Sequence, residues 1–407
     1  MKIVIIGAGE FGRGLASVLC GEGHEVVVVD NSSKLLKRLS ENLDIMTVQG
    51  NGLSGSVLRQ VLSSGADLLV AATGEDTANI LACQLGANLG VRETICRLSS
   101  EEYFDATPDF LPALFGINRI IVPSLECAEK IINVVGHRAV LEKIIFKDIG
   151  VEITSFRLET TSQLIGVRLR DFPDRSLLSK IRFSGIIRRG KFMIPRGETT
   201  FAADDEVFVS GLSESVIELI EWASGEKSAE SGERVIIGGA SAIGKRLAVE
   251  LLSSGYDVRI VEESRDKCEK ILESLGKNLM VLNGDPSDHE ILDEAGINGA
   301  IVYISAMEDD ENNVMSCMLA KKRGVKKAIT IVNKSDYSAL FSSLEMIDCF
   351  FSPSVVGVNS ALKFLEEEKS RVIALVHRAN AFVFELKVEK KSPVCGMRIA
   401  DCGNLPE

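Results

Sequence analysis

The stretch that decides the fold is Ile3–Gly12, IVIIGAGEFG, an apolar run that leads directly into three glycines. The run predicts a buried strand, and the apolar spacing that follows predicts a helix over residues 10–22. Gly7, Gly9 and Gly12 therefore stand where a strand turns into a helix, as a dinucleotide-binding turn requires. We expect Gly7 to permit the tight turn, Gly9 to let backbone amides approach a diphosphate, and Gly12 to permit close packing of helix on strand.

An acidic residue ends the next predicted strand. The run VVVVD at Val26–Asp30 puts Asp30 18 residues after Gly12. A carboxylate there accepts hydrogen bonds from both hydroxyls of a ribose and repels a 2′-phosphate, so it favours NAD over NADP. The variable positions of the glycine motif are Ala8, Glu10 and Phe11. Together these residues predict an adenine-nucleotide site; the alternative is a Rossmann fold that has lost its ligand.

Other polar residues follow the neighbouring strands. Because ligands of an open parallel sheet lie beyond the carboxyl ends of its strands, these residues are candidates for the same site. We expect Thr73, with Gly74 beside it, to touch the nicotinamide side or a phosphate. Asn51 is placed to reach the adenine, and Arg97 to pair with a phosphate. A surface salt bridge is the alternative for Arg97.

The whole pattern recurs after about 232 residues. VIIGGASAIG at 235–244 repeats IVIIGAGEFG, and VRIVE at 258–262 repeats VVVVD. Asn283-Gly284-Asp285 echoes Gly50-Asn51-Gly52, and further landmarks keep the same order. Two copies of one unit, fused head to tail, explain this order better than chance does.

The glycine motif of the second copy is degraded. It consists of Gly239, Ala240, Ser241, Ala242, Ile243 and Gly244. Ser241 replaces the middle glycine, and a side chain there is expected to crowd the approach of a diphosphate. Glu262 still offers a ribose ligand. Two interpretations of the second copy stay open. It is a second nucleotide site, or it is a structural copy that keeps the symmetry with the first unit.

Short apolar strands alternate with amphipathic helices in each copy. In the first copy we expect strands at 2–6, 25–29, 44–48, 67–72, 93–98 and 119–122, with helices at 10–22, 32–41, 54–63, 76–89 and 101–115. This rhythm predicts right-handed crossovers and a doubly wound parallel sheet. The predicted fold class is therefore α/β, with two tandem Rossmann-like sheets.

Strand signals dominate after about residue 136. Short strands are predicted at 151–158, 186–187, 191–194 and 206–209, with turns at 188–191 and 204–205 and a closing helix at 212–222. They predict a small α+β module, and the polar segment 225–232 predicts a flexible linker. The expected division is 1–135 and 233–369 for the Rossmann-like units, 136–224 for the first small module, 225–232 for the linker and 370–407 for a partial second module. We expect that last module to be truncated.

Composition excludes several classes of protein. The chain has 407 residues, 45% of them hydrophobic, and a net charge of −12, so it repels phosphate backbones and nucleic-acid binding is not expected. Nine scattered cysteines without a CxxC predict a reduced, cytosolic protein. No apolar run reaches the roughly 18 residues of a membrane span, so no direct membrane insertion is expected. A strand that begins at Lys2 leaves no room for a signal peptide.

Groups for catalysis are missing. The four histidines lie far apart with no metal-ligand spacing, so we expect no metal site. The acidic run at 308–311 is a candidate for a cation or, as the alternative, for a solvated helix N-terminus. No acid or base is placed to act on a substrate beside the glycine motif, so the nucleotide is expected to be a signal and the chain not an enzyme. The alternative is an NAD-dependent oxidoreductase with duplicated Rossmann domains.

The ordered motifs carry a family resemblance. GAGEFG, VVVVD, QGNG and ATGEDTAN, a β-rich module, and then GGASAIG, VRIVE, NGDPSD and MEDDENN resemble the TrkA family, the regulatory subunits of Trk potassium-uptake systems. The resemblance covers the whole chain and lies in the duplication more than in any single motif. It implies two regulator-of-conductance (RCK, or KTN) Rossmann units, of the TrkA-N type, each followed by a small TrkA-C module.

The resemblance also implies ligands and partners. It implies binding of NAD(H), and of ATP or ADP, and assembly into a ring, most simply a homotetramer. It implies docking on a membrane potassium transporter subunit of the TrkH, TrkG or KtrB type, hence a cytoplasmic protein at the inner face of the membrane. The nucleotide residues that it implies are Gly7, Gly9, Gly12, Asp30, Thr73 and Arg97 in the first copy, and Gly239, Gly244, Glu262, Asp285 and Ser305 in the second.

Overall fold

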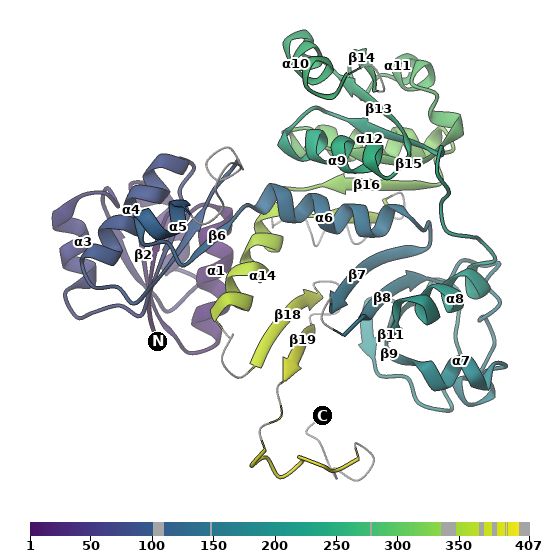
Figure 1. Ribbon diagram of the computed structural model, residues 1–407, viewed down its shortest axis with the longest axis horizontal. Coiled ribbons are helices and arrows are strands. Elements are labelled where there is room, and N and C mark those ends of the chain that lie inside the picture. The colour runs from purple at the N-terminus through teal and green to yellow at the C-terminus, as the bar shows by residue number, and fades with distance from the viewer. Residues whose placement is uncertain are drawn as a thin grey trace.

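The first Rossmann unit is a six-stranded parallel sheet with helices on both faces (Figure 1). The computed structural model describes residues 1–100, 110–146, 149–276, 279–334, 347–365, 370–376, 381–386, 388 and 390–398. The strands are β1 (Lys2–Ile6), β2 (Glu25–Asp30), β3 (Met46–Gln49), β4 (Leu68–Ala71), β5 (Glu93–Arg97) and β6 (Arg119–Ile121), in the order β3-β2-β1-β4-β5-β6. The helices are α1 (Glu10–Gly21), α2 (Ser33–Ser40), α3 (Gly55–Leu62), α4 (Asp76–Asn88) and α5 (Phe110–Phe115). Residues 101–109 of the predicted helix 101–115 lie outside the described residues.

The second Rossmann unit repeats this topology. Its strands are β12 (Arg234–Gly238), β13 (Asp257–Glu262), β14 (Met280–Asn283), β15 (Ala300–Ser305), β16 (Lys327–Ile331) and β17 (Cys349–Phe351), in the order β14-β13-β12-β15-β16-β17. Its helical elements are α9 (Ala242–Ser253), α10 (Arg265–Leu275), α11 (His289–Glu294), η3 (Ile297–Gly299) and α12 (Asp310–Lys322). The central strands are Val, Ile and Leu runs buried on both faces, as a covered parallel sheet requires. The two sheets confirm the predicted duplication and fold class.

A small antiparallel module separates the two units. Its strands are β7 (Val140–Phe146), β8 (Val151–Arg157), β9 (Ile181–Arg188), β10 (Lys191–Met193) and β11 (Glu206–Leu212), and its helices are η1 (Leu169–Asp171), α7 (Arg175–Lys180) and α8 (Ser213–Ser224). The predicted turn between β9 and β10 is present, with both Arg189 and Gly190 at positive φ. Near the chain end, β18 (Ser370–Val376) pairs with β19 (Ala381–Leu386). Residues 366–369, 377–380, 387, 389 and 399–407, most of them in the predicted partial module, lie outside the described residues.

The segment 225–232 is fastened at several points. The Ala229 amide donates to the Gly136 carbonyl at 2.7 Å, and the Gly232 amide donates to the Gly255 carbonyl at 2.8 Å. The Ser228 amide donates to Glu221 Oε1 at 2.8 Å. Its polar composition predicted a flexible linker; these bonds tie the segment to both neighbours, and its role as a linker stays a prediction. The domain boundaries themselves remain a prediction.

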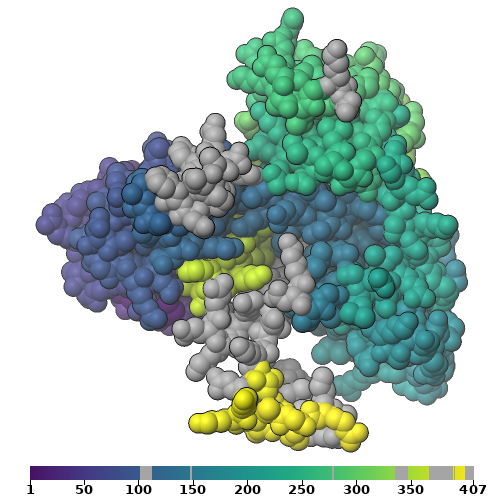
Figure 2. All heavy atoms as spheres, viewed as in Figure 1, coloured from purple at the N-terminus to yellow at the C-terminus, as the bar shows by residue number. Residues whose placement is uncertain are grey.

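Two helices are exchanged between the halves. Helix α6 (Pro123–Val135) follows the first sheet but packs on α9 of the second unit, and α14 (Pro353–Leu365) follows the second sheet but packs on α1 of the first. The two helices also pack on each other, and α14 lies between the first unit and the rest of the chain (Figures 1 and 2). Each sheet is therefore closed on one face by a helix that the other half supplies.

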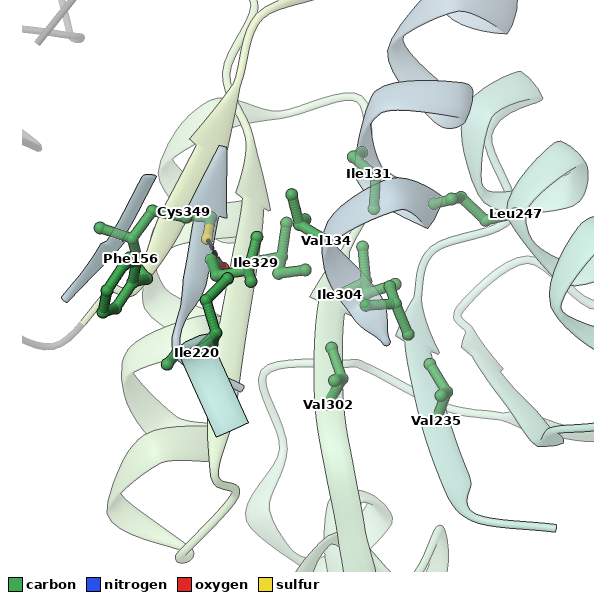
Figure 3. Close-up of a cluster of buried hydrophobic side chains, with 14 of the residues drawn as sticks. Ile131, Val134, Phe156, Ile220, Val235, Leu247, Val302, Ile304, Ile329 and Cys349 are labelled. Atoms are coloured by element: carbon green, nitrogen blue, oxygen red, sulfur yellow. Dashed lines mark hydrogen bonds between the residues drawn. The ribbon is translucent and has the colours of Figure 1, made fainter. Parts of the chain in front are cut away.

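The apolar clusters follow this exchange. Ile131 and Val134 of α6 lie among Leu247 of α9 and Ile304 of β15, in a cluster that also includes the small module (Figure 3). On the other side, Val358 and Leu362 of α14 join the cluster formed by the following α1 residues: Phe11, Leu15 and Leu19. Burying each such side chain contributes about 1.5–3 kcal/mol, so neither core is complete without its borrowed helix.

A buried lysine fixes the end of α6 to the second unit. Lys327, at the start of β16, has no exposed surface. Its ammonium donates to three carbonyl oxygens, those of Val134 at 2.6 Å, His137 at 3.0 Å and Val140 at 2.5 Å. These include carbonyls that the last turn of α6 leaves without helical partners. Burial lowers the pKa of Lys327, and the nearby Cys349 and Asp348 oppose that shift.

Among the described residues, no helix has both the length and the apolar character that a bilayer crossing demands.

Replacing Lys327 with methionine tests this attachment. Lys327→Met keeps most of the volume but removes the charged donor that three buried carbonyls share, so we expect a loss of about 2–4 kcal/mol of stability. Chemical unfolding would measure it, and hydrogen exchange should rise at the C-terminal end of α6. Lys322→Met, at an exposed position of α12, is the control. Equal stability of the two variants would contradict the role given to Lys327.

Candidate nucleotide-binding sites

The first glycine turn has the geometry that its sequence predicts. Gly7 has φ +111°, and its amide donates to the Val29 carbonyl at 2.8 Å. A Cβ atom on Gly7 would lie 2.6 Å from the Ala72 carbonyl oxygen, and one on Gly12 would overlap the carbonyl oxygen of Gly7. Both glycines are therefore demanded by the protein itself, since any side chain there would force apart β1, β4 and α1.

Gly9 has a different reason to be glycine. It is the N-cap of α1, makes no side-chain cap, and a Cβ atom there would meet no protein atom within 4 Å. The fold thus tolerates a side chain at this position. The open space lies at a helix N-terminus, where unpaired amides and the helix dipole favour an anion. Gly9 is the motif position whose small size serves a ligand.

Asp30 is held in place by the backbone. Its Oδ2 accepts from the Ala8 amide and its Oδ1 accepts from the Ser32 amide, both at 2.7 Å. These bonds join the end of β2 to the glycine turn and fix the carboxylate. Each carboxylate oxygen has a second lone pair, so the group can still accept from ribose hydroxyls. Asp30 therefore has the place and the capacity that ribose recognition requires.

Behind the site, hydrogen bonds centred on Asn79 form a bracket that fixes the loop after β4. Thr73 donates to Asn79 Oδ1 from its amide at 2.8 Å and from its hydroxyl at 2.7 Å. Asn79 Nδ2 donates in turn to the carbonyls of Thr73 at 3.1 Å and Arg97 at 2.8 Å. Asn79 is fully buried and was not among the expected residues. The repeated EDTAN and DENN motifs were the signal that could have found it.

Arg97 also belongs to this bracket. Its Nη1 donates to the Thr73 carbonyl at 2.9 Å, which is a contact with the loop backbone and not with a surface carboxylate. Burial lowers the pKa of Arg97, and the charge of Asp76 opposes the shift. Asp76 itself accepts from the amide and hydroxyl of Ser99. Whether Arg97 also meets a phosphate stays a prediction.

The remaining first-site residues divide into two groups. Asn51 is exposed after β3 and accepts from the Leu53 amide at 2.8 Å, while Gly74 has open space around it. Glu10 pairs with Arg13 across the first turn of α1 at 2.8 Å. Phe11 does not face the site, because its ring is buried against Gly357 of α14. The Phe11 side chain thus packs against the exchanged helix α14, and a contact of this residue with the cofactor stays a prediction.

The second site has nearly the same backbone hydrogen bonds as the first at its glycine turn and its acidic residue. Gly239 has φ +103°, and its amide donates to the Val261 carbonyl at 2.8 Å. Glu262 accepts from the Ala240 amide at 2.6 Å and the Ser264 amide at 2.8 Å, as Asp30 does in the first unit. The second unit therefore keeps the glycine turn and the fixed carboxylate.

The bracket behind the second site is also kept, with other side chains. Asn313 accepts from the Met307 amide at 2.8 Å and donates to the carbonyls of Met307 at 2.9 Å and Ile331 at 3.1 Å. Met307 thus stands where the first site has Thr73, and Ile331 where it has Arg97. The second site has the same frame but lacks that hydroxyl and that guanidinium.

Ser241 fits the turn without distorting it. Its backbone angles, φ −63° and ψ 173°, match those of Gly9, φ −67° and ψ −175°. Its hydroxyl accepts from the Gly244 amide at 3.3 Å, so the side chain caps the helix. Any crowding by Ser241 therefore affects a bound ligand and does not disturb the fold. The side chain also occupies an amide of the first turn that is uncapped in α1.

Two second-copy expectations need correction. Ser305 has no exposed surface; its hydroxyl donates to Thr330 Oγ1 at 2.9 Å and accepts from Cys317 at 3.2 Å, so it lies in the core and not in the site. The predicted correspondence of Asn283-Gly284-Asp285 with Gly50-Asn51-Gly52 was one residue out of register. The Gly50 and Gly284 amides both donate to the carbonyl of the acidic residue that ends the preceding strand. Asp285 is therefore the counterpart of Asn51, and it accepts from the Ser287 amide at 2.7 Å.

The acidic run at 308–311 is bonded within the protein. Glu308 pairs with Lys267 and Glu311 with Lys334, both at 2.9 Å. Asp309 caps α12 through the Asn312 amide at 2.8 Å, and Asp310 is buried and accepts from two backbone amides. Within the described ranges, no three His, Cys, Asp or Glu side chains gather as a metal site would require.

Comparison with known proteins gives the family. The TrkA-N domain family model matches residues 3–123 and 235–353, and the TrkA-C domain family model matches residues 153–224. This chain belongs to the TrkA family. Trk system potassium uptake protein trkA homolog 1 of Methanosarcina mazei is 32% identical over 405 residues, 97% of this chain and 97% of that protein. Trk system potassium uptake protein TrkA of Halomonas elongata is 33% identical over 364 residues, 89% of this chain and 78% of that protein.

Solved structures agree with the fold of this TrkA-family chain. The GsuK RCK domain matches with a TM-score of 0.65 at 20% identity, over 91% of this chain and 79% of that chain. The GsuK channel bound to NAD matches with a TM-score of 0.62 at 20% identity, over 91% of this chain and 66% of that chain. The predicted resemblance and the predicted fold class are both confirmed.

Exchanging the residues at the two N-caps tests why the sites differ. In this TrkA-family chain Gly9→Ser should leave the melting temperature the same or slightly higher, because the fold has room for the side chain and a serine there can cap α1. It should weaken nucleotide binding at the first site by about tenfold, through crowding and the loss of a free amide. Ser241→Gly should cost a few tenths of a kcal/mol of stability and leave the second site no weaker. Calorimetry with ADP would measure the nucleotide affinity of both sites. A first-site affinity that Gly9→Ser leaves unchanged would contradict the interpretation.

Asp30 carries a second prediction. Asp30→Ala should cost about 1.5–3 kcal/mol of nucleotide affinity, because hydrogen bonds to a charged group are lost. Asp30→Asn keeps an acceptor for one backbone amide and should narrow the preference for NAD over NADP. Titration with NAD and NADP measures both changes. Glu262→Gln, the matched change in the second unit, should leave the first site as it is. Equal affinity of Asp30→Ala and the unaltered protein for NAD would refute the assignment.

Proposed function

We propose that this TrkA-family chain is the nucleotide-binding regulatory subunit of a membrane potassium transporter. It binds NAD(H), and ATP or ADP, in its Rossmann clefts and so changes potassium flux through its partner. The observation that carries the proposal is the first glycine turn. Gly9 leaves an open, uncapped helix N-terminus beside the fixed carboxylate of Asp30. The relatives that cover nearly the whole chain are potassium uptake proteins by name, and GsuK binds NAD on the same fold.

The two sites are proposed to differ in strength. Residues assigned to the first site are Gly7, Ala8, Gly9, Glu10, Gly12, Asp30, Asn51, Thr73, Gly74 and Arg97. Those of the second are Gly239, Ala240, Ser241, Gly244, Glu262 and Asp285. The second is the weaker site because Ser241 caps its own helix, and because Met307 and Ile331 replace a hydroxyl and a guanidinium.

The nucleotide is proposed to act as a signal, so the chain is not an enzyme. Proton transfer to a substrate requires an acid or base within hydrogen-bond reach of the reacting group. His24 precedes β2, at the opposite edge of the sheet from the glycine turn, and lies 3.3 Å from the N-terminal ammonium. Asp30, Thr73 and Arg97 are bonded to the loops that they hold. Their hydrogen bonds favour a binding role over that of an oxidoreductase.

The assembly is proposed to be a ring at the inner face of the membrane. Each chain supplies two Rossmann units, so a homotetramer gives eight units and a closed cyclic assembly. We propose the division 1–135, 136–224, 225–232, 233–369 and 370–407 for these units, their small modules and the connection. A cytoplasmic ring docked on a potassium transporter lets a nucleotide bias the pore, provided that its affinity differs between two ring shapes.

Flux measurements test the proposal. With the purified chain and its transporter in vesicles, NADH or ATP should change potassium flux, and the doubly altered Gly9→Ser, Asp30→Ala chain should need at least about a hundredfold more nucleotide for the same response from the first site. Absorbance at the reduced-nicotinamide band should stay constant, since NADH is bound and not consumed. Substrate-dependent loss of that absorbance would favour the oxidoreductase, and flux insensitive to every adenine nucleotide would refute the proposal.

A further inference from the structure

The small module carries a basic segment on an otherwise acidic chain. Residues 175–197 hold seven lysines and arginines and no aspartate or glutamate, whereas the net charge of the whole chain is −12. The seven are Arg175, Lys180, Arg182, Arg188, Arg189, Lys191 and Arg196. The two acids that flank the segment are used inside the module, since Asp174 caps α7 through the Leu177 amide at 2.9 Å and Glu198 pairs with Arg170. A local positive field therefore remains at this surface.

The hairpin of β9 and β10 presents this charge at its turn. Arg189 and Gly190 have φ +52° and +73°, the conformation of a two-residue hairpin turn in which asparagine or glycine is usual. An arginine in this left-handed region is strained. Arg189 and Lys191 are exposed, and neither pairs with an acid among the residues that the structure describes. The turn therefore keeps a positive charge where an uncharged residue would fit better.

Arg188 anchors the hairpin from behind. Its Nε and Nη2 donate to the two carboxylate oxygens of Asp205 at 2.7 and 2.6 Å, and Nη2 also donates to the Thr200 carbonyl at 2.8 Å. Asp205 has no exposed surface, so this bidentate pair is fixed in place. Arg188 is thus neutralised within the module, while Lys191, its neighbour across the hairpin, is not. The hairpin is held firmly, and its outer charges face solvent.

Three apolar residues in a row follow the turn. Phe192 and Met193 of β10 and the next residue, Ile194, are 40%, 37% and 68% exposed, and β10 is an edge strand in the order β10-β9-β11-β8-β7. Consecutive exposed apolar residues at a sheet edge are unfavourable in water and usually serve a partner. Phe192 lies opposite Ile187 and Met193 opposite Ile186, so the two side chains are on opposite faces of the hairpin. A surface that meets the hairpin edge-on would cover both.

Two kinds of partner fit these residues poorly. A second copy of the chain that used the same hairpin would bring like charges together, and these would repel. A peptide that adds as a strand needs a longer edge, because β10 ends at Met193 and Pro195, which has no amide hydrogen, follows two residues later. An anionic bilayer fits well, since its headgroup layer offers negative charge along the whole hairpin and takes up apolar side chains just below that charge.

We propose that the β9–β10 hairpin docks edge-on to an anionic lipid bilayer. The basic side chains at and beside the turn, Arg189, Lys191 and Arg196, lie at the level of the lipid phosphates, and the apolar residues 192–194 enter the boundary between headgroups and acyl chains. That boundary still contains water, so the unpaired backbone groups of the edge strand stay hydrated. The proposal rests on the proposed place of the chain at the inner face of the membrane, and it names the surface that holds the chain there.

Vesicle binding by the purified full chain, without transporter or nucleotide, tests the proposal. The chain should sediment with vesicles of equal parts phosphatidylglycerol and phosphatidylcholine but not with phosphatidylcholine alone, and high salt should release it. Arg189→Glu with Lys191→Glu should weaken binding by at least about twentyfold, because each basic side chain near an anionic surface contributes about fivefold. Lys34→Glu with Lys270→Glu makes the same change of net charge at exposed positions of α2 and α10 and should have a much smaller effect.

A second pair of variants tests the apolar contact. Met193→Gln with Ile194→Gln removes apolar surface without a change of charge and should weaken vesicle binding by about tenfold. Leu272→Gln with Met280→Gln, at exposed positions of the second Rossmann unit, is the control and should bind as the unaltered chain does. The melting temperature of every variant is measured, so that lost binding is distinguished from lost folding.

Separate results overturn this proposal and the proposed function. Absence of binding to the anionic vesicles would refute the docking proposal, and so would equal binding by the hairpin variants and the unaltered chain. A hairpin variant that keeps its vesicle binding but loses the transporter would assign the hairpin to an acidic protein surface instead, and one that changes its sedimentation coefficient in solution would assign it to contact between copies. Potassium flux that ignores nucleotide while vesicle binding persists refutes the regulatory function alone.

Discussion

The exchange of α6 and α14 is the constraint on which the rest of the structure depends. A doubly wound sheet needs helices on both faces, and each sheet here takes one of them from the other half. The consequence is a continuous apolar interior that runs from the small module through α6 into the second unit. Gly357 illustrates how closely the parts fit, since a Cβ atom there would meet Phe11 at 2.8 Å. The position of each nucleotide turn is thereby linked to the packing of the opposite half.

The two nucleotide sites show which features of a Rossmann motif the fold needs and which a ligand needs. Gly7 and Gly12, like Gly239 and Gly244, are required by contacts within the protein, so they persist in both copies. The carboxylate at the end of the second strand also has a structural duty, since it holds the glycine turn in both units. Only the middle position is free of the fold, and only there do the motif glycines of the two copies diverge. Retention of Asp30 and Glu262 is thus weaker evidence for a ligand than the open N-cap at Gly9.

Much of this architecture was predictable from the sequence because local signals repeat. The apolar runs, the glycine turns and the 232-residue duplication predicted both sheets and the helices between their strands, but not the exchanged helices α6 and α14 or the short helix α7. Residues whose side chains serve long-range packing were harder to place. Phe11 lies inside the glycine motif and Ser305 ends a strand of the second copy, yet one faces a helix more than 300 positions away along the chain and the other faces Thr330. Lys327 gave no local signal at all, because a buried lysine is recognisable only when the three carbonyls that it meets are known.

The helix exchange also bears on what the covalent connection contributes and on how the chain responds to cleavage. Two separate copies could trade the same helices across a twofold axis, so the covalent connection at 225–232 is not what holds the halves together. A protease that cut there would leave the interlocked cores joined through α6 and α14. What the fusion contributes is pairing: each first unit always meets a second unit. Because this pairing is fixed, the two copies can differ, as they do at Gly9 and Ser241.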